Sequence, residues 1–520
     1  MHRITKICTR AGAILLAAGL CFCTIAMAGC GKKDDGSGKI INFPVEEAPR
    51  RLDPVIAGTP SELMVVNNCM EGLVRQDAEG NLAPGVAETW EVSPDGRTLT
   101  FHLRGDNRWR LPDKAKELLG EAAFAAFDTQ VTAGDFVFGL ERARGLRGEY
   151  ENILRVRAAD RRTLEITLEK PGAAFLYALA RGPAMPCNRT YFEACGGRYG
   201  LEAQYMPCNG PFYLDRMGDT LTRLKPNESC RDAASPGNRA LPATVNLWTE
   251  PDAYMRARLV GTEYDAAIVP ADLDAPLPEG VTGSELKNAT LALVFNCGAG
   301  PLADVNIRVA LCAALEPETL GIGAPPGLLP EGVLAGGANY RTAAGQPGGV
   351  KYDPARANAL AGGAGETIHL TLICAGEYET LLRCALQSWQ KAFRLRLEAQ
   401  IEPLEPEELQ ERLEDGEFDA AVALLHVERS AAPEALRALE GEGSPARYRS
   451  PALETLLDAA AQTDDTARAC LQAEEHLLQN GVFYPLRAMP GRLLLAPGVE
   501  GLEVSPVGDR LFFGGVRKWD

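Results

Sequence analysis

Histidine, cysteine and carboxylate side chains could carry chemistry in this chain, but their spacing matches no common catalytic or metal-binding pattern. His102, His369, His426 and His476 lie far apart in the sequence, and the fifth histidine, His2, belongs to the N-terminal leader. The sequence has no H-E-x-x-H metal motif, no G-x-S-x-G nucleophile motif and no G-x-x-x-x-G-K-[ST] phosphate loop. We therefore expect no catalytic residue, no metal site and no cofactor, and we expect that the protein is not an enzyme.

The N-terminal thirty residues have the pattern of a secretion signal that ends at a modified cysteine. A basic stretch precedes an apolar stretch, and Ala28 and Gly29 stand directly before Cys30. This pattern resembles the lipobox of bacterial lipoproteins, which implies cleavage before Cys30 and a diacylglycerol on its sulfur. Residues 1–29 would then be the signal peptide and residues 30–38 a polar, lipidated tether. A transmembrane anchor is disfavoured because the apolar stretch is short for a bilayer span.

Ten further cysteines are scattered over the chain after Cys30. They have no C-x-x-C pair, so a structural zinc site has no support. Disulfides among Cys187, Cys195, Cys208 and Cys230 and buried free thiols both remain open at this stage. A chain of this length can build a large core without disulfides.

The composition is that of a globular protein with an acidic surface. Hydrophobic residues make up 46% and charged residues 24% of the 520 residues, and the formal net charge is −17. A chain of this length exceeds what a single core usually holds, so we expect two large lobes or three domains. The negative charge argues against nucleic acid as a partner.

A long hairpin is the clearest element that the sequence predicts. Ser93-Pro94-Asp95-Gly96 places proline and glycine where a tight turn needs them, and residues 98–103 then alternate in the strand period. The hairpin lies within the stretch 67–109, which reads NNCMEGLVRQDAEGNLAPGVAETWEVSPDGRTLTFHLRGDNRW.

Further elements follow from local signals. Ser61 is the predicted N-cap of a helix, and residues 115–127 are predicted to be helical within an insertion at 111–130. The last ten residues, 511–520, are predicted to form an edge strand of the first lobe. A strand, an amphipathic helix and two more strands are predicted for the second half of the chain; they cover residues 368–373, 380–393, 396–401 and 418–425.

The stretch 67–109 resembles the most recognisable segment of the family 5 extracytoplasmic solute-binding proteins of peptide ABC importers, the oligopeptide- and dipeptide-binding lipoproteins. Other landmarks of that family follow in the expected order along the chain. These are VTAGDFVF (residues 131–138), NGPFYL (209–214), YDPARA (352–357) and RYRSPAL (447–453). The resemblance covers about residues 40–520.

The resemblance implies an α/β, two-lobe periplasmic-binding-protein-like fold of type II (cluster C), with an extra subdomain in the first lobe. The first lobe would span residues 39–288, with the subdomain at about 70–187. The second lobe would span 289–489, and residues 490–520 would return to the first lobe. The two crossings near Ala289 and Pro490 would act as a hinge.

The resemblance also implies which residues bind ligand. Ala57, Gly58 and Thr59 stand where the first lobe of the family pairs with an extended ligand. Leu424, Leu425 and His426 stand at the corresponding strand end of the second lobe, although ordinary strand core is an equal alternative for both leucines. Glu428 stands near the acidic residue that holds a peptide's ammonium, although the Trp and Tyr that flank this residue in the family are not retained.

The resemblance predicts a monomer, anchored by lipid to the outer face of the cell membrane, that captures short peptides and delivers them to the permease and ATPase subunits of an ABC importer. A family 5 protein for another solute is the first alternative, such as a nickel complex, haem or an oligosaccharide. An extracytoplasmic hydrolase is the second. Strand addition suits an importer of mixed peptides, because backbone hydrogen bonds bind without reading side chains.

Overall fold

The computed structural model describes most of the chain from residue 36 onward. The described residues are 36, 38–76, 82–146, 150–171, 175–180, 182–230, 241–270, 273, 275–323, 326–335, 338–361, 367–394, 396–427, 431–463, 465–505, 507–508 and 510–519. The predicted signal peptide, Cys30 and Glu428 lie outside these ranges. No helix among the described residues is both long enough and apolar enough to span a bilayer.

Four strands form a sheet that contains the first strand of the described chain. Its order is β1-β10-β9-β8, in which β1 and β10 are parallel and the other pairs antiparallel. Three more strands form a second sheet of order β11-β20-β12, whose central strand comes from the far end of the chain. The bounds are β1 (Ile40–Val45), β8 (Phe212–Arg216), β9 (Leu221–Pro226), β10 (Thr244–Thr249), β11 (Ala266–Pro270), β12 (Thr282–Leu286) and β20 (Gly491–Leu495).

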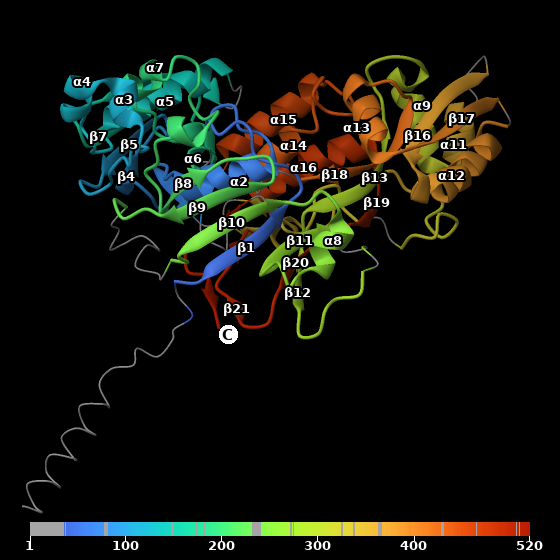
Figure 1. Cartoon of the computed structure of the whole chain (residues 1–520). Helices are drawn as coiled ribbons and strands as arrows, with labels where there is room; N and C mark the ends of the chain where they lie inside the picture. The colour runs from blue at the N-terminus through green and yellow to red at the C-terminus, as the bar shows by residue number, and fades with distance from the viewer. Residues whose placement is uncertain are drawn as a thin grey trace, which may run out of the picture.

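The predicted hairpin forms half of a separate antiparallel sheet of order β4-β5-β7-β6. Gly96 has a φ of +68°, and its amide donates to the Ser93 carbonyl at 2.8 Å, which confirms the predicted turn. Short helices surround this sheet, at the blue and teal end of the molecule in Figure 1. The bounds are β4 (Ala87–Val92), β5 (Thr98–Leu103), β6 (Ile153–Ala158), β7 (Thr163–Leu168), α3 (Ala115–Leu119), α4 (Glu121–Ala125), α5 (Ala133–Leu146), α6 (Phe175–Ala178) and α7 (Arg189–Ala194). Two other helices belong to the first two sheets: α2 (Pro60–Cys69) packs beside β8, and α8 (Ala253–Arg258) packs beside β11.

Residues 289–488 build a five-stranded sheet of order β17-β16-β18-β13-β19. All seven residues of β13 are buried, because helices cover both faces of this sheet. One face packs against α9, α11 and α12, and the other packs against α14, α15 and α16. The bounds are β13 (Ala289–Phe295), β16 (Ile368–Ala375), β17 (Leu397–Leu404), β18 (Ala420–His426), β19 (Phe483–Ala488), α9 (Val305–Ala313), α10 (Tyr340–Ala344), α11 (Pro354–Ala361), α12 (Glu379–Ala392), α13 (Pro406–Asp415), α14 (Ala432–Arg437), α15 (Pro451–Gln462) and α16 (Thr466–Gln479).

The chain passes between these parts at two points that lie side by side. The Met489 amide donates to the Ala289 carbonyl at 3.0 Å, and the Gly491 amide donates to the side-chain oxygen of Asn288 at 3.0 Å. The Asn288 carbonyl in turn accepts from the Val427 amide at 2.9 Å, directly after β18. Asn288 therefore ties both crossings to the end of a central strand.

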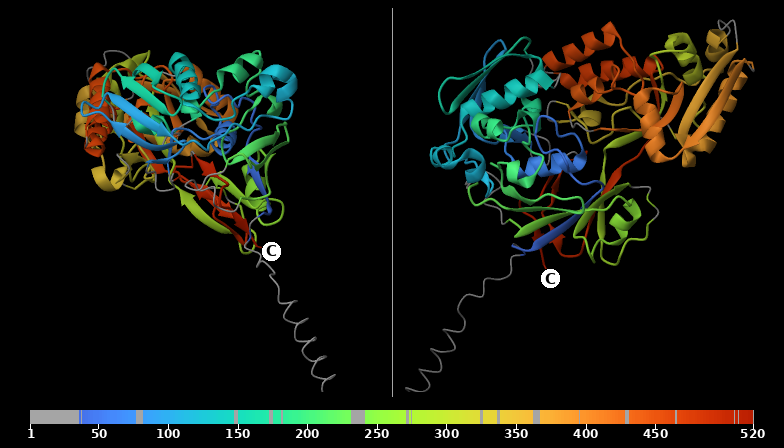
Figure 2. Two further views of the ribbon diagram at one scale, coloured as in Figure 1. Left: turned by 90° about the vertical axis from the view of Figure 1, so that its left-hand side faces the viewer. Right: turned by 45° about the horizontal axis from the view of Figure 1, so that its top comes forward.

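Helices α14 to α16 also approach the subdomain that contains the hairpin sheet. Figure 1 and the right-hand view of Figure 2 both place these orange-red helices beside the teal helix α5. Lys170, which follows β7, forms an ion pair of 3.0 Å with Asp458 of α15, and Arg437 of α14 contacts the same carboxylate at 3.0 Å.

Three local predictions were wrong. Thr59, not Ser61, is the N-cap of α2, because Pro60 can occupy the first helical position. The predicted helix over 115–127 is divided into α3 and α4 at Gly120, whose φ of +79° is not helical.

The third concerns the C-terminus, where residues 511–520 are not an edge strand of the main sheet. They form two short ribbons instead, β23 (Leu511–Phe512) with β22 (Glu503–Val504) and β24 (Arg517–Lys518) with β21 (Val499–Glu500). The ring of Phe513 lies 5.7 Å from that of Phe43 in β1. This end of the chain therefore packs into the same core as β1. Two further ribbons lie elsewhere, β2 (Val74–Gln76) with β3 (Leu82–Pro84) and β14 (Leu334–Ala335) with β15 (Ala338–Asn339).

Candidate functional site

The loop before α2 carries the first group of predicted ligand residues, and the Glu62 carboxylate holds it. Oε2 of Glu62 accepts from the amides of Gly58 at 3.0 Å and Thr59 at 3.3 Å, while Oε1 accepts from the Arg51 amide at 2.8 Å. Burial by itself would raise the pKa of Glu62, but the amide donors hold it below the ordinary value of 4.5. The buried carboxylate is therefore charged at neutral pH and fixes the loop from its helix side.

Within this loop, the three predicted residues differ in exposure. Ala57 is buried, and its amide donates to the Asp53 carbonyl at 2.8 Å, whereas Gly58 is exposed. A Cβ added to Gly58 would meet nothing closer than 3.9 Å, so the space beside this residue is open. Thr59 is half-buried as the helix cap. Ile56, which was not predicted, exposes 40% of its surface next to them.

The end of β18 carries the second group. Leu424 exposes 39% of its surface and His426 is exposed, whereas Leu425 is buried at 8%. The strand pairs with β13 along its whole length, but with β16 only at Ala420 and Ala421. The backbone edge beyond Ala421 lies outside the ladder with β16, which is the kind of edge that strand addition uses.

Glu428, the predicted partner for a peptide ammonium, lies outside the described residues. The chain resumes at Ala431, which forms an isolated bridge with Leu334. The structure describes β18 and the following Val427, one residue before Glu428. The role of the Glu428 carboxylate stays a prediction.

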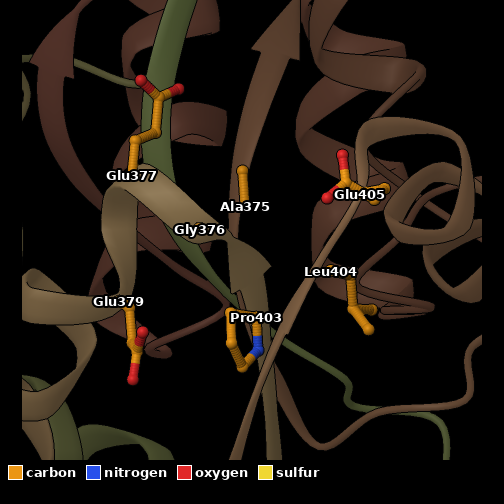
Figure 3. Close-up of a pocket in the computed structure, with 7 residues that line it drawn as sticks. All are labelled: Ala375, Gly376, Glu377, Glu379, Pro403, Leu404 and Glu405. Atoms are coloured by element: carbon orange, nitrogen blue, oxygen red, sulfur yellow. The ribbon is translucent and has the colours of Figure 1, made fainter.

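One pocket is lined by none of the predicted ligand residues. It has a volume of about 570 Å³ and is located at the carboxyl ends of β16 and β17. Figure 3 shows the carboxylates of Glu377, Glu379 and Glu405 spread around it rather than converging on one point. The other residues that line it are Ala375, Gly376, Pro403 and Leu404. Within the described ranges, no group of three or more histidine, cysteine or acidic residues could hold a metal ion. The pocket therefore provides no evidence for a metal site.

The cysteines that follow Cys30 are all free thiols in the structure, so none of the disulfides considered from the sequence is present. Burial raises the pKa of Cys187, Cys312 and Cys470 to about 12. These thiols are protonated at neutral pH and are poor nucleophiles.

Comparison with known proteins identifies the family. Residues 81–444 match the model of the bacterial extracellular solute-binding proteins, family 5 Middle. The chain belongs to this family. The dipeptide-binding protein DppE of Bacillus subtilis is 27% identical to this family 5 protein. The match covers 62% of this chain and 60% of the length of DppE. The periplasmic murein peptide-binding protein MppA of Escherichia coli is 24% identical over 89% of this chain and 90% of its own length.

A solved structure supports the fold of this family 5 protein. The complex of Haemophilus influenzae OppA with RPPGFSPFR matches with a TM-score of 0.71 and 20% identity, over 94% of this chain and all of the other chain. The mixed α/β, two-lobe periplasmic-binding fold predicted from the sequence is thereby confirmed. The matched family consists of solute-binding proteins rather than enzymes.

Proposed function

We propose that this family 5 protein captures short peptides in a cleft between its lobes and delivers them to the permease and ATPase subunits of an ABC importer. The observation that carries the proposal is the backbone edge of β18 beyond Ala421, next to the exposed Leu424. An extended peptide could add to this edge as a strand. The names of the relatives support the same class of ligand, since DppE and MppA are described as dipeptide- and murein peptide-binding proteins.

Lipid attachment at Cys30 belongs to the same proposal and would keep the protein at the outer face of the cell membrane. Replacing Cys30→Ala in the full chain should move the protein from the membrane fraction to the soluble fraction. Retention of the variant in the membrane fraction would contradict the lipid anchor.

The ligand class is tested by mass spectrometry of small molecules that co-purify with a chain beginning at residue 39. We expect a mixture of short peptides that is lost after mild denaturation and washing. Release of a single non-peptide solute would favour the alternative of a family 5 protein for another ligand. Turnover of an added peptide would instead support a hydrolase.

The role of the loop is tested by Gly58→Leu. This substitution fills the open space beside residue 58 and keeps the hydrogen bond from its backbone amide to the Glu62 carboxylate. We expect weaker binding of every peptide in a panel by a similar factor of about tenfold, because a side chain in the cleft blocks the peptide main chain. Gly443→Leu is the matched control, since Gly443 is also exposed and an added Cβ would meet nothing within 4 Å. Equal affinity of Gly58→Leu and wild type would remove this loop from the site.

The ammonium anchor is tested by calorimetry of one peptide with a free and an N-acetylated terminus. Wild type should bind the free peptide more tightly, and Glu428→Gln should lose that preference, because a charge-assisted hydrogen bond is roughly twice as strong as a neutral one. If acetylation and the substitution both leave affinity unchanged, Glu428 does not anchor an ammonium.

A further inference from the structure

The loop Asp53–Thr59 is held from a second side by a residue of the subdomain. Arg142 of α5 donates from Nη1 to Oδ1 of Asp53 at 3.1 Å and from Nη2 to Oδ2, so the pair is bidentate. Both side chains are largely buried, with 14% of Arg142 and 8% of Asp53 exposed. The guanidinium also lies 4.1 Å from the ring centroid of Phe192. Burial by itself would lower the pKa of Arg142, but the bond to Asp53 raises it.

Asp53 transmits this contact to the loop through its own backbone and side chain. Its carbonyl accepts from the amides of Ile56 at 3.0 Å and Ala57 at 2.8 Å, and Oδ1 accepts from the Val55 amide at 3.2 Å. The chain just before Asp53 is equally constrained. The Leu52 amide donates to the Gly200 carbonyl at 2.8 Å.

Gly200 is needed for this close approach. It has a φ of +73°, and an added Cβ would lie 2.3 Å from the Asp53 nitrogen. The turn at Asp53 therefore rests directly against the backbone of Gly200, with no space for a Cβ between them. The Arg142 pair fixes one end of the loop, and Glu62 fixes the other.

We propose that Arg142 is a positioning residue of the ligand site. Its bidentate ion pair with Asp53 holds Ala57, Gly58 and Thr59 in the conformation that binds peptide. This inference rests on the proposed function, because it assumes that the loop contacts ligand. Lysine cannot replace Arg142 fully, since a single ammonium cannot form two parallel bonds to a carboxylate or stack on the Phe192 ring in the same way.

Amide hydrogen exchange of the unliganded protein tests the positioning role without any ligand. In Arg142→Met and Asp53→Asn, the amides of residues 55–57 should exchange about tenfold faster, because the loop opens locally while the sheets remain folded. Arg142→Lys should give an intermediate effect, and it keeps the test valid if Arg142→Met does not fold. Arg144→Met is the matched control, because Arg144 is exposed on the same helix.

Calorimetry with RPPGFSPFR and Met-Leu then separates this inference from the proposed function. Faster exchange at residues 55–57 together with weaker peptide binding supports both. Faster exchange with unchanged binding supports the positioning role and overturns the assignment of the loop to the ligand site. Unchanged exchange in all three variants, or an equal increase throughout the protein, overturns the positioning role of Arg142, whatever the peptide affinity is.

Discussion

At the scale of single residues, Glu62 gives the loop before α2 its order by serving two roles at once. Its carboxylate completes a capping box with Thr59 at the start of α2, and it also accepts from the amides of Arg51 and Gly58. A carboxylate that accepts several amide hydrogen bonds favours its charged form. The order of the loop should therefore depend on pH.

We predict that Glu62→Gln reduces the free energy of unfolding at pH 7 by about 1–3 kcal/mol, because the amides of Arg51, Gly58 and Thr59 lose a charged acceptor. The pKa of Glu62 is lowered in the fold, so its contribution to stability is complete above the ordinary value of 4.5 and is lost as pH falls through the lower, folded-state value. Urea unfolding at a series of pH values should show wild type and variant converging on the acid side.

Glu117→Gln, at an exposed position in α3, serves as the control for the loss of one negative charge. A constant difference between wild type and Glu62→Gln from pH 7 to pH 3 would contradict the role of the charge.

Part of this loop follows a recognisable sequence pattern. Thr59-x-x-Glu62 matches a capping box, but the prediction placed the N-cap at Ser61. The family resemblance predicted Ala57, Gly58 and Thr59 as ligand residues, and this role stays a prediction. Nothing in the sequence connects Asp53 with Arg142, because the pair joins residues 89 positions apart through tertiary packing. The exposure of Ile56 could not be predicted either, since it depends on how the turn at Asp53 rests on the subdomain.

At the scale of elements, backbone hydrogen bonds join the two ends of the insertion at 111–130. The Trp109 amide donates to the Thr129 carbonyl at 2.7 Å, and the Val131 amide donates to the Asn107 carbonyl at 3.1 Å. Helix α3 packs into a cluster of buried side chains that also come from α7 and its neighbouring segments, whereas no residue of α4 is buried. This cluster contains Ala115, Cys187, Tyr191, Cys195, Tyr199 and Tyr205.

We predict that replacing residues 112–127 by two glycines leaves peptide affinity within about twofold of wild type. The hydrogen bonds between residues 107–109 and 129–131 already hold the two ends of the insertion together, so closing the shorter loop costs little entropy. The free energy of unfolding should fall, since Tyr191 and Tyr199 lose part of their cover. Calorimetry and urea unfolding measure the two effects. A large loss of affinity in a folded deletion variant would show that the insertion contributes to ligand binding.

In the five-stranded part, a buried ion pair joins α10 to α16. Glu474 is fully buried and accepts from Nη1 of Arg341 at 2.8 Å and from the Tyr340 hydroxyl at 2.7 Å. The same carboxylate accepts from the amides of Leu328 and Leu329. It therefore holds the segment before α10 as well as the helix itself.

We predict that Arg341→Met destabilises the protein by about 3–5 kcal/mol, because it leaves the Glu474 carboxylate buried without its cation. Arg383→Met is the control, since Arg383 pairs with Glu379 at the surface. Urea unfolding should separate the two variants clearly. Equal stabilities would mean that water or another donor replaces the Arg341 guanidinium.

Element types were predicted well where periodicity is strong, as in the hairpin and in the strand and helix pattern that became β16, α12, β17 and β18. Boundaries failed where a single residue decides them, as at Gly120 between α3 and α4. Neighbour relations between strands could not be predicted from local patterns. The ladder between β16 and β18 ends at Ala421, which is a property of the sheet and not of either strand.

At the scale of the whole molecule, the ion pair between Lys170 and Asp458 joins the subdomain to the five-stranded part. Burial by itself would raise the pKa of Asp458. The contacts with Lys170 and Arg437 favour the charged carboxylate, and the pKa is lowered overall. Both partners are partly exposed, and such pairs contribute about 0–1 kcal/mol. If the parts move about the paired crossings at Asn288, this contact can form only when they are close together.

We predict that Lys170→Glu shifts the unliganded protein toward an open arrangement by up to about fivefold in population, because a like-charge contact replaces an attractive one. Distance measurements between spin labels on α5 and α15 report the shift, which should shrink at high salt. Lys351→Glu, at an exposed position before α11, controls for net charge. Identical distance distributions for Lys170→Glu and wild type would exclude a contribution of this pair to closure.

The strand order β11-β20-β12 constrains how the protein can be assembled as it is made. Strands β11 and β12 do not pair with each other; both pair with β20, which follows them by about two hundred residues. A chain that emerges from its N-terminus can complete the five-stranded sheet while β20 is still absent, and β11 and β12 keep open edges during that time. Strand β20, the last strand of this sheet to be made, therefore joins β11 to β12. A chain truncated before residue 491 would retain all strands of the five-stranded sheet but would leave the sheet of β11 and β12 unfinished.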